Sequence, residues 1–396
     1  MRILVADDQG FWRMALEDCL LTYGHQVVCV GSAEAALAVL RSDREVDMLV
    51  TDWVMPGMDG VELCRQAREM ERDRYLPIIM LTGSGESTSL VAALDAGADA
   101  FIRKPLDEPE LQAQIHVAER ILALECRLES RIAELRQAKE RIEQDLVHAA
   151  EIQRSFMPKA PPDVPGISFA WHFQTSRHLG GDIFDVVRLD DDHIAVHVLD
   201  VSGHGTSAAL HSVALSHVLH PDGRLGGILT RPSPDGEGTC PVAPAEVARE
   251  LNQRFPLIER SGHYFTLLYG ILDLRSLCFR YVRAGHPGPL HVSGGNVRSH
   301  DRLGGIPVGV APDITWEDHE IRLARGDQLV LITDGLFENV NEHGEAFGNE
   351  RIHEVLARCA ERSAEATVEA LQLGLAEFCK HEPSRDDVTI VGLRID

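Results

Sequence analysis

The sequence predicts two folded domains of different classes: an α/β, doubly wound five-stranded parallel sheet, joined by a long helix to an α+β β-sandwich. Three observations predict this. Short apolar runs alternate with helical patterns over residues 1–120, a charged helical stretch follows, and grouped strand patterns fill the remainder. At 396 residues the chain is also too long for one typical core.

The N-terminal part has five candidate strands, each of three to five residues. They are Ile3–Ala6, Val27–Val30, Met48–Thr51, Ile78–Thr82 and Ala100–Ile102. Helical patterns such as Phe11–Leu21 and Ala33–Arg41 separate them. Strict alternation of strand and helix indicates βαβ units and a parallel sheet. In such sheets functional residues gather at the carboxyl ends of the strands.

The connecting segment, Glu108 to Phe156, is charged and contains no Gly or Pro after Pro109. One heptad seam is mostly apolar: Ile121, Leu128, Leu135, Ile142, Ala149 and Phe156. The partner seam is weaker: Leu124, Arg131, Ala138, Asp145 and Ile152. The segment is either an amphipathic helix lying on a domain or, as we favour, a parallel coiled coil that makes a homodimer. Prolines from Pro158 onward end it.

The C-terminal part combines strand patterns with helical stretches between them. The expected strands are Ile194–Leu199, Phe265–Leu272, Leu277–Arg283, Gln328–Thr333 and Val388–Arg394. The expected helices are Ser207–Val218, Ala243–Gln253, Arg351–Ala357 and Glu365–Cys379. Strands that are grouped in this way favour an α+β layered sandwich over a second parallel sheet.

Polar residues end the strands of the predicted parallel sheet. Asp7 and Asp8 follow the first strand, Asp52 the third, Thr82 ends the fourth, and Lys104 follows the fifth. Carboxylates at one sheet edge repel each other unless a cation lies among them, and Mg²⁺ prefers such oxygen ligands. The ammonium and hydroxyl groups can hold phosphoryl oxygens, and Asp52 can then act as the nucleophile that forms an acyl-phosphate.

This pattern resembles the response-regulator receiver (CheY-like) family over residues 1–122. The resemblance implies that Asp52 is the phosphoacceptor, charged by a histidine kinase, and that Asp7, Asp8 and Asp52 bind Mg²⁺. It implies that Thr82 and Lys104 sense the phosphoryl group. It also implies a cis peptide bond before Pro105 and a switch aromatic at Phe101.

A second set of carboxylates stands at strand ends in the C-terminal part. Asp182 lies in HLGGDIFDV, Asp200 in HVLDVSGHG, Asp334 in LVLITDGLFE, and the pair Asp386 and Asp387 in SRDDVTIV. No His/Cys cluster accompanies them, which favours hard metal ions over zinc. Two Mg²⁺ or Mn²⁺ ions that share a carboxylate can activate a bridging water toward a phosphoryl group.

The order GGDIFD, DVSGHGTSAAL, AGHPGPL, GGIPVGV, TDGLFE and RDDVT resembles the PPM (2C-type) serine/threonine phosphatases, and within them the SpoIIE-type branch. The matching domain is 158–396, after a helical linker over 123–157. The resemblance implies metal ligands at Asp182, Asp200, Asp334 and the Val201 carbonyl, with Asp200 bridging and catalytic. For the last ligand we favour Asp386 over Asp387. His204 is either a general acid or a helix cap, and His286 is structural.

Together the two resemblances imply a response regulator that controls a metal-dependent phosphoprotein phosphatase. The usual substrates of this branch are phosphorylated anti-anti-sigma (STAS-type) proteins. The alternative is a catalytically silent phosphatase-like adaptor for a sigma-factor-pathway protein. Adaptors of that kind lack several of the aspartates that are present here, which favours the enzyme.

Composition excludes other classes of protein. A formal net charge of −24 argues against partners such as nucleic acid and anionic membrane surfaces. The eight cysteines are scattered, without a C-x-x-C pair, which is typical of reduced thiols in the cytoplasm. No apolar run is long enough to span a bilayer, and the N-terminus indicates a strand, so we expect a cytoplasmic protein.

Overall fold

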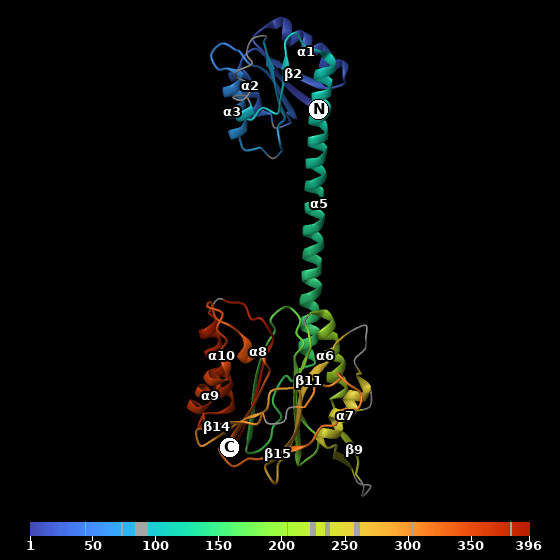
Figure 1. Ribbon diagram of the computed structural model, residues 1–396, viewed down its shortest axis with the longest axis vertical. Coiled ribbons are helices and arrows are strands. Elements are labelled where there is room, and N and C mark those ends of the chain that lie inside the picture. The colour runs from blue at the N-terminus through green and yellow to red at the C-terminus, as the bar shows by residue number, and fades with distance from the viewer. Residues whose placement is uncertain are drawn as a thin grey trace. The chain divides into compact units, whose positions relative to one another are not determined.

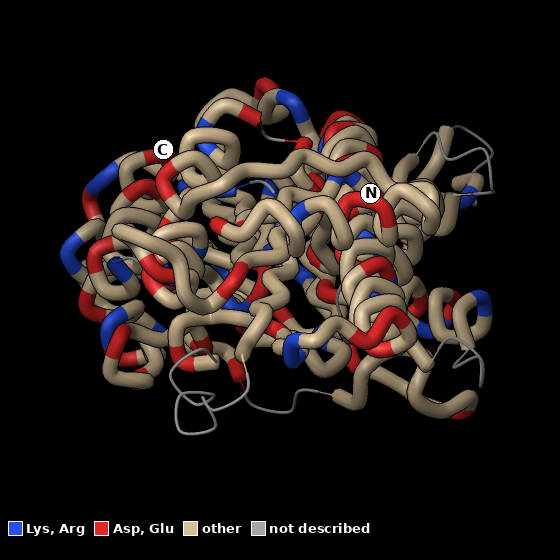
Figure 2. The backbone as a smooth tube through the Cα atoms, turned by 90° about the horizontal axis from the view of Figure 1, so that it is seen from above, with Lys and Arg blue, Asp and Glu red and all other residues tan. Residues whose placement is uncertain are grey.

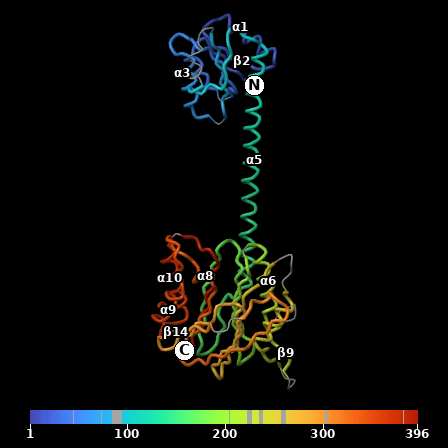
Figure 3. Tube along the Cα trace, viewed as in Figure 1, coloured from blue at the N-terminus to red at the C-terminus, as the bar shows by residue number. Residues whose placement is uncertain are grey.

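The computed structural model describes residues 1–43, 45–72, 74–83, 94–203, 205–221, 227–233, 238–256, 262–301, 305–380 and 382–396. The chain forms two compact units, Met1–Glu140 and Arg141–Asp396. Each is described by itself below, with elements labelled as in Figure 1 and chain order followed by colour in Figure 3.

The first unit contains a five-stranded parallel sheet in the order β2-β1-β3-β4-β5. Its strands are β1 Arg2–Ala6, β2 Gln26–Val30, β3 Met48–Asp52, β4 Ile78–Thr82 and β5 Ala100–Arg103. Its described helices are α1 Gly10–Thr22, α2 Ala33–Ser42, α3 Gly60–Glu69 and the start of α5. Crossing from β2 to β3 over β1 is the doubly wound order, so the predicted fold class is confirmed.

Both faces of this sheet are covered, which explains why its central strands are continuous apolar runs. Residues such as Leu4 and Leu49 pack with α2 and α3 on one side. Ile3 and Val50 pack with α1 and the start of α5 on the other. Alternate residues of one strand therefore enter two cores, and the polar residues that end the strands lie at the sheet edge.

Helix α5 is continuous over Glu108–Ser155, 48 residues. Its first turns belong to the core of the first unit, where Leu111 and Ile115 are buried. Farther along, the apolar side chains of the predicted seam are exposed: Leu128 is 62% and Leu135 is 70% accessible to solvent. This stretch of α5 therefore has no apolar partner among the described residues of the chain.

The second unit is a sandwich of two antiparallel five-stranded sheets, in the orders β15-β12-β11-β8-β7 and β14-β13-β16-β17-β6. The strands are β6 Ile167–Gln174, β7 Ile183–Arg188, β8 His193–Val201, β11 Phe265–Asp273, β12 Cys278–Ala284, β13 Leu290–Ser293, β14 Asn296–Ser299, β15 His319–Arg322, β16 Gln328–Ile332 and β17 Val388–Ile395. A short hairpin is formed by β9 Thr230–Pro232 and β10 Thr239–Pro241. The predicted sandwich is confirmed.

Helices cover the outer faces of both sheets (Figure 1). They are α6 Thr206–Val218 and α7 Pro244–Arg254 on the first sheet, and α8 Gly335–Glu338, α9 Gly348–Arg358 and α10 Ala364–Cys379 on the second. The main core lies between the sheets and under α6 and α7, and a smaller one lies under α9 and α10. The strand ends that carry the candidate site are thus held by buried layers.

Charge is distributed widely. Figure 2 shows acidic positions along most of the traced chain, interspersed with fewer basic ones, in keeping with 62 acidic and 38 basic residues. Among the described residues, no helix is both long and apolar enough to cross a membrane.

Two candidate catalytic sites

The first site lies at the carboxyl edge of the parallel sheet. Asp7 follows β1, Asp8 is next to it, and Asp52 ends β3. Each of the three offers a carboxylate oxygen, and these oxygens lie within 4.8 Å of one another. Oδ1 of Asp8 has no hydrogen-bond partner among the described residues. A set of three close carboxylates with an unpartnered oxygen fits a hard divalent cation such as Mg²⁺.

Lys104 supplies the positive charge of this site. Its Nζ lies 2.7 Å from Oδ2 of Asp7 and 2.9 Å from Oδ1 of Asp52. The Trp12 ring lies beside the ammonium, 5.3 Å from ring centroid to Nζ. Burial raises the pKa of Asp52, while Lys104 opposes that shift. The lysine therefore favours the ionised carboxylate, which is the nucleophilic form.

Thr82, Phe101 and the bond before Pro105 were also singled out in the sequence. Thr82 ends β4 and is buried, and its carbonyl accepts a hydrogen bond from the Lys104 amide, 2.8 Å from N to O. Phe101 lies on β5 and is half-buried. The bond between Lys104 and Pro105 is cis, as expected.

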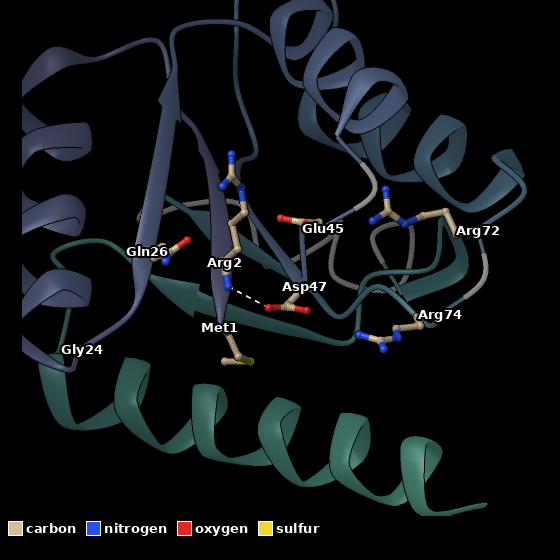
Figure 4. A pocket seen from close by; sticks show the side chains of 8 residues that line it. All are labelled: Met1, Arg2, Gly24, Gln26, Glu45, Asp47, Arg72 and Arg74. Carbon is tan, nitrogen blue, oxygen red and sulfur yellow. Dashed lines mark hydrogen bonds between the residues drawn. The ribbon is translucent and has the colours of Figure 1, made fainter. Parts of the chain in front are cut away.

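A pocket of about 770 Å³ also lies in the first unit, but at the opposite edge of the sheet (Figure 4). It is lined by Met1 and Arg2 at the start of β1 and by Arg72 and Arg74. The amide of Arg2 donates a hydrogen bond to Asp47 there, 2.7 Å from N to Oδ2. The pocket is separate from the three carboxylates, none of which lines it.

The second site is built by both sheets of the sandwich. Asp182 precedes β7 and Asp200 lies near the end of β8, both in the first sheet. Asp334 follows β16, and Asp386 and Asp387 precede β17, in the second sheet. Segments far apart in the sequence thus bring carboxylates to one end of the sandwich.

Asp182 is the most deeply placed carboxylate. It is 1% exposed, and its Oδ2 accepts hydrogen bonds from the hydroxyls of Thr333 (2.8 Å) and Thr389 (2.6 Å). Burial, followed by the charges of Asp200 and Asp387, raises its pKa well above the ordinary value despite these donors. The two threonines fix the side chain from the second sheet, and the sequence analysis missed them. The available signal was their position in the sequence, one residue before Asp334 and two residues after Asp387.

The carboxylates of this site disfavour one another's charge. Burial, then the charges of Asp334, Asp386 and Asp387, raise the pKa of Asp200 to about 7. Burial and the charge of Asp386 raise the pKa of Asp334 to about 6. Buried carboxylates that destabilise each other are the arrangement that bound cations would neutralise.

Gly181 leaves room in the middle of the site. A Cβ at this position would lie 2.6 Å from the carbonyl oxygen of Val201 and 3.4 Å from Oδ1 of Asp200. Only glycine keeps that carbonyl and that carboxylate accessible. All of these donors are hard oxygens, so the residues present fit Mg²⁺ or Mn²⁺.

Asp386 and Asp387 differ in their surroundings. Oδ1 of Asp387 accepts from the Ser176 amide (2.8 Å), and its Oδ2 accepts from the Gly181 amide (2.7 Å). Asp387 is therefore engaged in anchoring the glycine loop to β17. Asp386 is exposed, and its charge raises the pKa of both Asp200 and Asp334. This arrangement supports the preference for Asp386, whose role as a ligand stays a prediction.

The two histidines of interest are placed differently. His204 lies outside the described residues. His286 is buried, and its Nδ1 lies 2.7 Å from the hydroxyl oxygen of Thr266. Burial lowers the pKa of His286 to about 3, so it stays neutral at physiological pH. These features are in keeping with a structural role.

Gln153, in the last turn of α5, also reaches this region and was missed. It is 3% exposed, and its Nε2 donates to the Gly180 carbonyl (2.7 Å) and to Oγ of Ser212 (3.0 Å). Its Oε1 accepts from the Gly180 amide at 3.4 Å. The linker helix is thus bonded directly to the loop that contains Gly181 and Asp182.

Comparisons with known proteins match both parts of the chain. The model of the response regulator receiver domain matches residues 3–116, and the model of stage II sporulation protein E (SpoIIE) matches residues 190–396. The chain is 37% identical over 114 residues to the phosphate regulon transcriptional regulatory protein PhoB of Rhizobium meliloti, covering 29% of this chain and 50% of that protein. It is 43% identical over 115 residues to response regulator MprA of Mycobacterium avium. This match covers 29% of this chain and 49% of that protein.

This chain therefore spans about half the length of these curated relatives. Among solved structures, the SiaA-PP2C domain of Pseudomonas aeruginosa is similar to the second unit. It has a TM-score of 0.53 and 25% identity, and the match covers 65% of this chain and 99% of that one.

Fold and site together define a chain that combines a receiver domain with a PP2C-type phosphatase domain. The SpoIIE model matches just over half of the sequence, and the chain belongs to the SpoIIE family. Asp182 lies before the matched range, so its place in the site rests on the hydrogen bonds described above.

Proposed function

We propose that this protein is a response regulator in which phosphorylation of Asp52 controls a metal-dependent protein serine/threonine phosphatase. The observation that carries the proposal is that Asp182, Asp200, Asp334 and Asp386 come from both sheets and lie near enough for their charges to interact, with Gly181 beside Asp200. An adaptor that had lost catalysis would have no need to keep four mutually repelling carboxylates together.

In the receiver, Asp52 would attack the phosphoryl group of a histidine-kinase phosphodonor. The carboxylate oxygen forms the new bond to phosphorus, and the donor's imidazole nitrogen leaves. Asp7, Asp8 and Asp52 would hold Mg²⁺. Lys104 is already within hydrogen-bond distance of Asp52 and can neutralise the added phosphoryl oxygens.

In the phosphatase, Asp182, Asp200, Asp334, Asp386 and the Val201 carbonyl would hold two Mn²⁺ or Mg²⁺ ions, with Asp200 between them. When bound, such ions lower the pKa of a water and neutralise phosphoryl oxygens. The chain's own contribution is positioning. Thr333 and Thr389 orient Asp182, and Asp387 holds the glycine loop that leaves the centre open.

Hydrolysis of p-nitrophenyl phosphate with and without Mn²⁺ tests the enzyme against the adaptor. We expect turnover that requires the metal and is removed by a chelator. Absence of turnover in excess Mn²⁺ would favour the adaptor, because that function does not require a metal-activated water.

The substrate and the partners are proposed from the resemblance to the SpoIIE-type branch. We propose a phosphorylated anti-anti-sigma (STAS-type) protein as the substrate and a histidine kinase as the phosphodonor. A pull-down with an Asp200→Ala variant, which would retain but not hydrolyse a phosphoprotein, would identify the substrate by mass spectrometry.

The two sites are coupled, in this proposal, through α5. Phosphorylation with acetyl phosphate should change the turnover or the Mn²⁺ requirement of the wild type, but not of an Asp52→Ala variant. Gln153→Ala should abolish the response, because the bonds from α5 to Gly180 are lost, while Gln144→Ala, exposed on the same helix, should retain it. Equal turnover of Asp52→Ala and the phosphorylated wild type would contradict the coupling.

We also propose that the exposed seam of α5 forms a parallel homodimer. Multi-angle light scattering should give the mass of a dimer for the wild type. A double variant, Leu128→Asp with Leu135→Asp, should give a monomer because charge would be buried in the seam. Ala133→Asp, on the opposite side of the heptad, is the matched control and should stay dimeric. A monomeric wild type would contradict the proposal that this seam forms a homodimer.

A further inference from the structure

Asn339 is a buried amide next to the second candidate site, and the sequence analysis gave it no role. It ends the short helix α8, which begins directly after Asp334. Asn339 is only 2% exposed to solvent. A buried amide must have its donors and acceptor satisfied, so its partners indicate what it holds in place.

The partners of Asn339 lie on two different segments. Nδ2 donates to the Gly335 carbonyl (2.6 Å) and to Oγ of Ser384 (2.9 Å), and Oδ1 accepts from the Arg385 amide (2.8 Å). Oγ of Ser384 in turn donates to the carbonyl of Asp386, 2.7 Å away. One side chain therefore joins the turn after Asp334 to the loop that carries Asp386.

The backbone of Asn339 is itself anchored. Its carbonyl accepts a hydrogen bond from the amide of Phe347, 2.9 Å from N to O, and Phe347 belongs to the core beneath α9 and α10. Asn339 therefore has a rigid base from which it can hold the loop. Ser384 and Arg385 lie just before β17, so the bonds from Asn339 tie this loop to the core beneath α9 and α10.

On the other side of the turn, Gly335 lies against the same loop. A Cβ on Gly335 would lie 1.9 Å from the carbonyl oxygen of Asp387 and 3.4 Å from the carbonyl carbon of Asp386. The glycine allows the two segments to touch, and the Asn339 amide fastens them. Together they hold the turn after Asp334 against the loop that carries Asp386.

We propose that Asn339 is a positioning residue that holds the Asp386 loop against Asp334 and thereby sets the affinity of the phosphatase domain for its divalent cation. This inference rests on the proposed function, since it assumes that Asp334 and Asp386 ligate the same metal centre. Asn339 itself does not touch the metal, and it acts through the Ser384–Asp386 backbone. Partners of metal ligands typically contribute about 10- to 100-fold in affinity or activity.

The test is Mn²⁺ binding to the full chain carrying Asp7→Asn and Asp52→Asn, which removes the proposed receiver cation site. Binding is measured by isothermal titration calorimetry and independently of turnover. Asn339→Ala should weaken Mn²⁺ binding by about 10- to 100-fold. At saturating Mn²⁺ its kcat toward p-nitrophenyl phosphate should be near that of the wild type, since every ligand is still present. Ser384→Ala, which removes one link and leaves α8 intact, should weaken binding in the same direction by less.

Asn341→Ala is the matched control. Asn341 lies in the same segment, but among the described residues its side chain is hydrogen-bonded within the turn, to His343 and Glu345. It should bind Mn²⁺ as the wild type does. If Asn339→Ala lowers the melting temperature but leaves Mn²⁺ affinity unchanged, Asn339 is merely structural and the inference is overturned. A chain that carries only the two receiver changes and binds no Mn²⁺ would overturn the proposed phosphatase function and this inference together.

Discussion

Asp200→Asn should abolish phosphatase turnover. The charges of Asp334, Asp386 and Asp387 act on the Asp200 carboxylate, and in the proposed site Asp200 is shared by both metal ions. Because even an indirect partner of a metal ligand costs about 10- to 100-fold, loss of the shared ligand should cost at least about 100-fold. Metal-dependent hydrolysis of p-nitrophenyl phosphate measures this loss. Asp313→Asn, at an exposed aspartate, should keep the wild-type rate.

The same substitution should stabilise the metal-free protein. The pKa of Asp200 is raised to about 7 by burial and by neighbouring carboxylates, whereas it is about 3.9 in an unfolded chain. Between these values the folded state holds a proton that the unfolded state has lost, so the free energy of unfolding falls as pH rises from about 4 to about 7. Asparagine removes this penalty, on the order of 2–4 kcal/mol at pH 8.

Thermal unfolding in the presence of a chelator tests whether the substitution stabilises the metal-free protein. The melting temperature of Asp200→Asn should exceed that of the wild type at pH 8, and the difference should disappear near pH 4. Added Mn²⁺ should reverse the order at pH 8, since only the wild type keeps its ligands. Protons compete with the metal, so Mn²⁺ affinity of the wild type should fall as pH drops below about 7. A metal-free Asp200→Asn protein less stable than the wild type at pH 8 would contradict this account.

Asp52→Asn should eliminate phosphorylation of the receiver. The amide oxygen is a poor nucleophile and cannot form the acyl-phosphate, so acetyl phosphate should label the wild type and leave the variant unlabelled. Phosphate-affinity gel electrophoresis with Mg²⁺ measures the difference. Asp18→Asn, at an exposed position of α1, is the matched control and should be labelled normally.

Removing Lys104 should have a separate effect. Its ammonium bonds both Asp7 and Asp52, so Lys104→Ala leaves three close carboxylates without a cationic side chain. The Lys104→Ala variant should be labelled more slowly than the wild type, and higher Mg²⁺ should recover part of the rate.

For the Asp52→Asn variant, labelling at the wild-type level would contradict the prediction, because it would show that another residue accepts the phosphoryl group.

Much of the fold could be predicted because its signals are local. The three central receiver strands, β1, β3 and β4, are buried on both faces, so their sequences are short apolar runs that end in polar residues. One continuous helix is predicted for the linker because Gly and Pro are absent after its first turn. The edge strand β14, by contrast, is mostly exposed and carries no such pattern. Its pairing with β13 depends on the neighbouring layer, which local sequence does not encode.

The sequence by itself determined the chemical types present and their places at strand ends: the receiver carboxylates, and Asp182, Asp200, Asp334, Asp386 and Asp387 in the phosphatase domain. Only the tertiary structure decided how these groups differ. The Asp387 carboxylate accepts a hydrogen bond from the Gly181 amide, 206 positions away in the sequence. The Asp182 carboxylate accepts one from the Thr389 hydroxyl, 207 positions away. The anchoring roles of Gln153 and Asn339 are equally nonlocal. A hydrogen bond depends on distance and direction in space, and local pattern constrains neither across such separations.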